Sequence, residues 1–238
     1  MDRFEMTPRT AFETPLAIGA DRVTAFLRKV YGWMFVGLAI TAATAFAVAG
    51  SPALVQAIFG NPILFIALIV AELGLVIALS ARVDRMAPRT AAVLFVTYSA
   101  LNGATLSAIL LAFTGASLAT TFVVTAGMFG ALALYGTTTK RSLAGVGQFF
   151  FMGLIGLVLA SIVGLFWRAP ALQFVISVVG VLVFTGLTAW DAQRLKAMAA
   201  VTPDDRVAGR SVVGALALYL DFINLFLFLL RFLGARRD

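Results

Sequence analysis

Long apolar runs separated by short polar stretches dominate the chain, and seven of them are long enough to cross a lipid bilayer. A helix rises about 1.5 Å per residue, so roughly 20 apolar residues cover a hydrocarbon core of about 30 Å. We therefore expect seven membrane-spanning helices, over residues 30–49, 63–80, 91–113, 118–135, 146–166, 171–190 and 215–234.

Composition supports the same class of protein. Hydrophobic residues make up 61% of the 238 residues, charged residues make up 12%, and the mean hydropathy is +1.01. A soluble domain is typically about 45–50% apolar and about 25% charged. We expect an all-α polytopic membrane protein, with a flexible cytoplasmic tail over residues 1–25 and a seven-helix transmembrane domain over residues 26–238.

The absence of cysteine and histidine limits the chemistry of the chain. Thiolate metal sites, cysteine nucleophiles and imidazole bases are excluded, so proton-linked behaviour falls to carboxylates. We expect no cofactor. The net charge of +7 is typical of membrane-protein loops that meet anionic lipid, and we expect a lipid bilayer rather than nucleic acid around the protein.

Basic residues gather on one side of the expected bundle. Of the 18 lysines and arginines, all but four lie in the N-terminal tail or in loops on the same side as that tail; the exceptions are Arg168, Arg231, Arg236 and Arg237. The positive-inside rule then predicts a cytoplasmic N-terminus and, after an odd number of spans, an external C-terminus. The basic C-terminal sequence GARRD conflicts locally with this orientation, and a re-entrant seventh segment is the alternative.

The last apolar run, over residues 215–234, carries Asp221 near its middle and Asn224 one helical turn later. An ionised carboxylate at that depth costs about 2.5–3.5 kcal/mol on insertion scales, so such residues are seldom accidental. At about 100° per residue, one stripe of this helix contains Gly214, Asp221, Asn224, Phe228 and Arg231. We expect this stripe to face protein or water.

Two other acidic residues fall within or beside apolar runs. Glu72 lies near the middle of the second span, and Asp191 lies where the sixth span reaches the cytoplasmic side. Each has a plain structural alternative. Asp191 could be a solvated residue at a helix end, Asp221 a structural hydrogen-bonding group, and Glu72 a buried protonated acid.

Carboxylates on consecutive helices are typical of two kinds of membrane protein. They bind a hard cation such as Ca²⁺, which prefers several oxygen ligands, or they form an aspartyl pair for intramembrane proteolysis. The chain lacks the Gly-x-Gly-Asp and Tyr-Asp elements of such proteases, histidine for a rhomboid-type protease, and a mid-membrane lysine for retinal. We therefore do not expect an enzyme.

Three stretches resemble the Bax inhibitor-1 family, including its bacterial YccA-like members. They are FLRKVYGWMFVGLAITA, GLTAWDAQRLK and, most specifically, ALALYLDFINLFLFLLRFLG. The resemblance implies that the other six helices surround the seventh. It also implies that Asp191 and Asp221 form a pH-sensitive pair on the cytoplasmic side of a Ca²⁺ leak, with Glu72 near the pathway and Arg82 or Arg85 as a latch on the pair.

The position of the pair along the bundle raises a difficulty. By helical rise, Asp221 and Asp191 differ in depth by roughly 10–13 Å. They can meet only if the sixth span is set deeper or the seventh helix begins before Val212.

These observations favour a pH-sensitive Ca²⁺ leak in a bacterial inner membrane. Asp221, Glu72 and Asn224 are the expected cation pathway, and Asp191 with Asp221 is the expected pH sensor and Ca²⁺ site. Two nearby buried carboxylates do not both ionise cheaply, so the pair should share a proton and open on moderate acidification. The alternative is a regulatory membrane protein that restrains a membrane protease or a stress-response partner.

Overall fold

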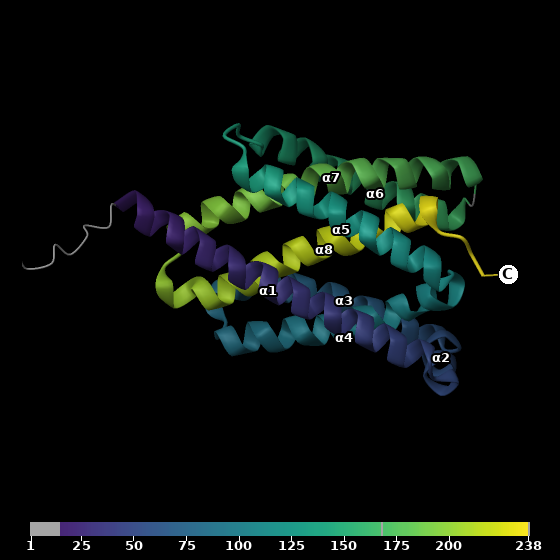
Figure 1. Ribbon diagram of the computed structural model, residues 1–238. Helices are drawn as coiled ribbons and strands as arrows, with labels where there is room; N and C mark the ends of the chain where they lie inside the picture. The colour runs from purple at the N-terminus through teal and green to yellow at the C-terminus, as the bar shows by residue number, and fades with distance from the viewer. Residues whose placement is uncertain (1–14, 168, 238) are drawn as a thin grey trace, which may run out of the picture.

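The computed structural model describes residues 15–167 and 169–237, and this part of the chain is almost entirely helical (Figure 1). Its α-helices are α1 (Pro15–Ala49), α2 (Pro52–Phe59), α3 (Pro62–Arg82), α4 (Pro88–Ala112), α5 (Gly115–Thr138), α6 (Ala144–Phe166), α7 (Pro170–Val201) and α8 (Val207–Leu233). Short 3₁₀ turns, Val83–Arg85 and Asp204–Arg206, precede α4 and α8. Every α-helix except α2 is long and apolar enough to cross a membrane, which confirms the all-α class and the seven spans.

Local sequence sets several of the helix starts. Proline opens several of the helices, among them α2, α3, α4 and α7 at Pro52, Pro62, Pro88 and Pro170. Proline suits this position because its fixed φ fits the helix and its missing N–H would have no partner within the helix. Before α3, the Asn61 side chain accepts hydrogen bonds from the backbone N–H groups of Ile63 and Leu64, at 3.1 and 3.3 Å. These caps satisfy donors that a helix end otherwise leaves free.

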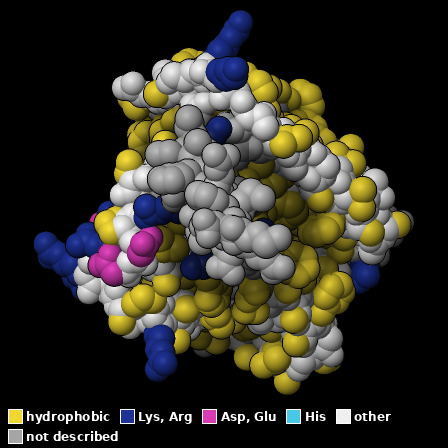
Figure 2. Space-filling model, turned by 60° about the vertical axis from the view of Figure 1, so that its left-hand side comes forward, with side chains coloured by type: hydrophobic (Ala, Val, Ile, Leu, Met, Phe, Trp, Pro, Cys, Tyr) yellow, Lys and Arg dark blue, Asp and Glu magenta, His cyan; other side chains and the backbone are white. Residues whose placement is uncertain are grey.

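Successive long helices run in opposite directions along the bundle (Figure 1). We call one end the basic end: it is formed by the start of α1 and by the α3–α4, α5–α6 and α7–α8 connections. Figure 2 looks onto this end and shows lysine and arginine side chains spread around it, beside a small acidic group. The opposite end carries α2, the α4–α5 and α6–α7 connections and the C-terminal segment.

Helix α8 runs unbroken from the basic end to the opposite end. Beyond it, the C-terminal segment pairs with the α4–α5 turn, where the Thr114 N–H donates to the Ala235 carbonyl at 3.1 Å and the Arg237 N–H donates to the Ala112 carbonyl at 3.0 Å. A re-entrant segment would return to the basic end instead. The alternative of a re-entrant seventh segment is therefore wrong.

The helical part of the chain begins earlier than the expected boundary at residue 25. Helix α1 starts at Pro15, and its Phe26 and Val30 are buried in the core. Within this helical stretch Arg22 contacts the α7–α8 turn, where it donates to the Thr202 carbonyl. The rest of the expected flexible tail, residues 1–14, lies outside the described residues.

Helix α8 is the centre of the bundle, as the sequence predicted. Of its most apolar stretch 61% is buried, more than in any other spanning helix of the described chain. It packs against α1, α3, α4, α5 and α7, whereas α6 packs mainly on α7. Close packing elsewhere depends on small residues: a Cβ on Gly103 of α4 would lie 2.5 Å from the Thr41 carbonyl of α1. Helices in lipid commonly approach through such positions.

Candidate functional site

Two carboxyl groups meet between the central helix and its neighbour α7. Asp221 lies in the middle of α8 and is only 4% exposed, while the side chain of Asp191 on α7 is 13% exposed. The Asp191 and Asp221 carboxyl groups lie close enough to interact with each other. Oδ2 of Asp221 is fully buried and receives no hydrogen bond from an N–H or hydroxyl group among the described residues. Such a contact between the two carboxyl groups is a hydrogen bond only when one of them carries a proton, because two ionised carboxylates have no proton to donate.

The lengths of α7 and α8 bring the two carboxyls to similar depths. Helix α7 continues past Asp191 to Val201, and α8 already begins at Val207, before Val212. By helical rise, Asp191 lies about 15 Å and Asp221 about 21 Å from the turn that joins the helices. The difficulty of depth is mainly removed by the continuation of α7, which places Asp191 almost three turns before the end of its helix and leaves the two depths about 6 Å apart. Helix α8 also begins before Val212, which meets one of the two conditions that the sequence set.

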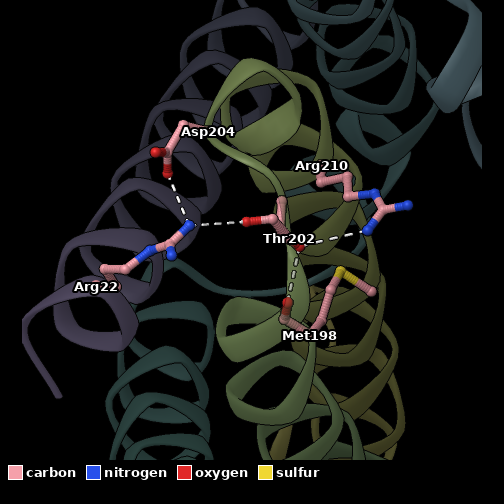
Figure 3. A network of polar contacts seen from close by, with 5 residues as sticks. All are labelled: Arg22, Met198, Thr202, Asp204 and Arg210. Carbon is pink, nitrogen blue, oxygen red and sulfur yellow. Dashed lines mark hydrogen bonds and ion pairs between the residues drawn. The ribbon is translucent and has the colours of Figure 1, made fainter. Parts of the chain in front are cut away.

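A group of side chains holds the turn between α7 and α8 (Figure 3). Arg22 of α1 donates to the Thr202 carbonyl at 3.2 Å and to the Asp204 carboxylate at 2.7 Å. Arg210 of α8 donates to the Thr202 hydroxyl at 3.4 Å and to the Asp84 carboxylate at 3.0 Å. Exposed ion pairs contribute little singly. Together, however, they tie α1, α7, α8 and the turn before α4 at the basic end, and so fix the register of the hairpin that carries the two aspartates.

The cation beside the pair is Arg194. Its Nη1 lies 3.3 Å from Oδ1 of Asp191, one turn away on the same helix. Arg82 and Arg85, the expected latch residues, are exposed at the end of α3 and make no ion pair within the described residues. The structure therefore does not bring the expected latch to the pair. The i,i+3 spacing of Asp191 and Arg194 in WDAQR fits this contact on one helix, although it does not single out Arg194 by itself.

Glu72 belongs to a second polar group, which we call the Glu72 chain: Glu72, Thr105, Asn102, Tyr219 and Thr41. The half-buried Glu72 carboxylate accepts hydrogen bonds from the Asn102 amide at 3.2 Å and from the Thr105 hydroxyl at 2.9 Å. The Tyr219 hydroxyl donates to Oδ1 of Asn102 at 2.9 Å and lies 2.6 Å from the Thr41 hydroxyl. The chain therefore crosses the bundle from α3 through α4 and α8 to α1.

The Glu72 chain and the aspartate pair lie on different sides of α8. Tyr219 and Asp221 are two residues apart, which turns their side chains about 200° from each other. Asn224 does not join them, since its amide donates to the Leu220 carbonyl of its own helix at 2.8 Å. Within the described residues there is no group of three or more acidic, histidine or cysteine side chains placed to hold a metal ion. The expected pathway residues thus form two separate sites in this structure.

Sequence reasoning missed most of the Glu72 chain. Thr41, Asn102 and Tyr219 are buried polar residues inside apolar runs. Serine and threonine hydroxyls are common in membrane helices because they can form hydrogen bonds to the backbone of their own helix. Thr41 therefore did not stand out in the sequence as a site residue. Tyr219 gave a weak one, because it stands two residues before Asp221 and away from the bundle ends where tyrosine usually lies.

Comparison with known proteins places these features in a family. The family described as "Inhibitor of apoptosis-promoting Bax1" matches residues 23–238. The chain belongs to the Bax inhibitor-1 family. The matched region covers the seven spanning helices and includes both the aspartate pair and the Glu72 chain.

Several bacterial relatives in the family are similar along nearly their whole length. An Escherichia coli protein named "Inner membrane protein YbhL" is 47% identical, over 100% of both chains. An uncharacterized protein of Borreliella burgdorferi is 46% identical over 90% of this chain and 93% of its own, and one of Caulobacter vibrioides is 42% identical over 93% and 96%. These similarities confirm the family that the three sequence stretches indicated, and the protein is an integral membrane protein.

Proposed function

We propose that this Bax inhibitor-1 family protein is a pH-sensitive Ca²⁺ leak, closed at its basic end by the Asp191–Asp221 pair. The observation that carries the proposal is the contact between two carboxyls in the bundle interior, one of them on the central helix. Such groups within membrane helices mark ion and proton pathways by default. The name of the relative YbhL supports a bacterial inner membrane as the location, and the positive-inside rule supports a cytoplasmic basic end and N-terminus.

The shared proton supplies the pH dependence. With one proton and one negative charge, the pair forms a charge-assisted hydrogen bond, which is stronger than a neutral one. Arg194 lies beside the remaining charge. A second proton neutralises the pair, weakens its hydrogen bond and leaves Arg194 without its partner. Helix α7 then separates from α8 more readily, so acidification favours the open state.

Glu72 is the second carboxylate that we assign to the ion pathway. Ca²⁺ prefers several oxygen ligands, and the Glu72 chain offers carboxylate, amide and hydroxyl oxygens in one place. Glu72→Gln keeps the size and most hydrogen bonds of the side chain while removing its charge. We expect this variant to lower Ca²⁺ flux, and unchanged flux would leave Glu72 with a structural role only.

Ca²⁺ entry into liposomes that contain the purified protein tests the proposal. We expect flux in protein-containing liposomes at pH 6, none in protein-free liposomes, and an altered rate in Asp221→Asn. Asp205→Asn is the matched control, because Asp205 is an exposed carboxylate at the same end of the bundle. If no condition gives flux above protein-free liposomes, the leak is refuted and the regulatory role remains as the alternative.

A further inference from the structure

An apolar groove of about 640 Å³ opens on the surface of the bundle, and neither Asp191 nor Asp221 lines it. Parts of α1, α4, α5 and α8 line it, all of them in the half of the bundle away from the basic end. Its volume falls within the range of about 300–1,000 Å³ that is usual for small-ligand sites. Thr41 is the one member of the Glu72 chain that lines the groove, so the rest of its lining needs its own explanation.

Small residues on two of its walls leave room for the groove. Its lining includes the small residues Ala42, Ala45 and Ala49 of α1, Gly50 directly after α1, and Gly115 and Ala119 of α5, beside larger residues of both helices. Buried Phe222 and Ile223 of α8 line its floor, and exposed aromatic side chains such as Phe46 and Phe122 stand at its rim. The exposed rim means that, in a membrane, the groove opens toward the lipid.

Only Thr41 and Arg237 are polar among the lining residues. The Thr41 hydroxyl is already engaged with Tyr219 and with the Ser99 carbonyl. Arg237, in contrast, is exposed and has no ion pair in the described part of the chain. A ligand of this groove therefore meets one positive charge at one end and hydrocarbon elsewhere.

The backbone holds Arg237 at the groove. Its N–H donates to the Ala112 carbonyl at 3.0 Å, and the Ala235 N–H donates to the Ser117 hydroxyl at 2.9 Å. An isolated antiparallel bridge between Phe113 and Arg236 completes this contact between the C-terminal segment and the α4–α5 turn. Arg237 is thus fixed where the groove reaches the end of the bundle, which is the level of lipid headgroups.

We propose that the groove binds one anionic phospholipid, with an acyl chain in the groove and the phosphate on Arg237. An empty apolar groove facing the bilayer fills with lipid chains, but this filling selects no particular lipid, because lipid tails are as apolar as the groove walls. Selection must come from charge. A basic residue at the membrane surface attracts an anionic headgroup, and the fixed Arg237 is the residue placed to do so.

Native mass spectrometry of the full-length protein in detergent tests this inference. The probes are phosphatidylglycerol and phosphatidylcholine with identical acyl chains, and we expect preferential retention of phosphatidylglycerol. Arg237→Gln should lower that preference about fivefold, the change expected for one basic residue near anionic lipid. Arg236→Gln is the matched control and should change it little, since Arg236 does not line the groove.

A second pair of variants tests the hydrocarbon part of the site. Ala119→Phe places a ring in the groove, whereas Ala131→Phe places one on an exposed position of α5 outside it. We expect only Ala119→Phe to abolish phosphatidylglycerol retention. Glycerol 3-phosphate, which has the headgroup charge without the chain, should not compete.

Three outcomes would overturn the inference. They are equal retention of the two lipids, equal effects of Arg236→Gln and Arg237→Gln, and full competition by glycerol 3-phosphate, which would indicate a simple phosphate site. A dimer that dissociates in Ala119→Phe would instead assign the groove to a second copy of the chain. If Ala119→Phe does not fold, as judged by circular dichroism, the exposed Arg237→Gln and Arg236→Gln variants still decide the result.

Discussion

Replacing Tyr219 with phenylalanine removes one hydroxyl group from the middle of the bundle and leaves its ring in place. The ring contacts with Phe95 and Tyr98, at centroid distances of 5.8 and 5.7 Å, should survive. Two hydrogen bonds disappear, one to Asn102 and one to Thr41. Hydrogen bonds between membrane helices are worth about 0.6 kcal/mol on average and about 1.7 at most, so the loss should total roughly 1–3 kcal/mol.

Reversible unfolding in mixed micelles of increasing SDS content, followed by circular dichroism, measures this loss. Tyr135→Phe is the matched control, because Tyr135 is exposed at the end of α5 and 51% accessible. The control should be within about 0.5 kcal/mol of wild type. If Tyr219→Phe is no less stable than Tyr135→Phe, the Glu72 chain does not hold α8 to α1 and α4, and our account of the bundle centre fails.

Three further predictions concern packing, the basic end and the pH response. Gly103→Ala should destabilise the bundle by about 1–3 kcal/mol in the same assay, because the new Cβ would meet the Thr41 carbonyl. Gly74→Ala is the control and should be neutral or stabilising, because a Cβ there meets open space. Equal effects of the two substitutions would refute close packing of α1 on α4. Arg22→Gln should lower the free energy of unfolding by at most about 1 kcal/mol, and this difference from wild type should vanish in 1 M salt. A decrease in stability that does not depend on salt would show that packing, not charge, holds the α7–α8 turn. Since the chain lacks cysteine, spin labels attached at exposed Ala197 of α7 and Arg89 of α4 can report the distance between these two helices. This distance should increase as the pH falls in the wild type and stay constant in Asp221→Asn. A constant distance in the wild type would contradict the proposed movement.

The spans were predictable because the bilayer imposes a length and a composition on every helix that crosses it. The same reasoning failed where helices leave the hydrocarbon region. Residues 15–25 and the start of α8 at Val207 lie outside the expected spans but are helical, and their Arg22 and Arg210 make contacts at the basic end. Boundaries set by tertiary contacts leave little trace in a hydrophobic pattern.

Asp191 and Asp221 could be named from the sequence, since a carboxylate near an apolar run is rare. The cation that lies beside Asp191 could not be named from the sequence. The family resemblance suggested Arg82 or Arg85, but both side chains are exposed in the structure, and Arg194 lies one turn from Asp191. The groove could not be predicted from the sequence either, because its lining residues come from separate helices, α1, α4, α5 and α8, that meet only in the folded bundle.

The pH profile of Ca²⁺ flux into liposomes, from about pH 5 to 8, tests the central claim most directly. The assay compares wild type with Asp191→Asn, Asp221→Asn and the control Asp205→Asn. We predict that wild-type and control flux rise as the pH falls. Each pair variant should give a flatter profile, because a single remaining carboxyl no longer shares a proton with a second acid. If both pair variants keep the midpoint of the wild type, the Asp191–Asp221 contact does not sense the proton and the account is contradicted.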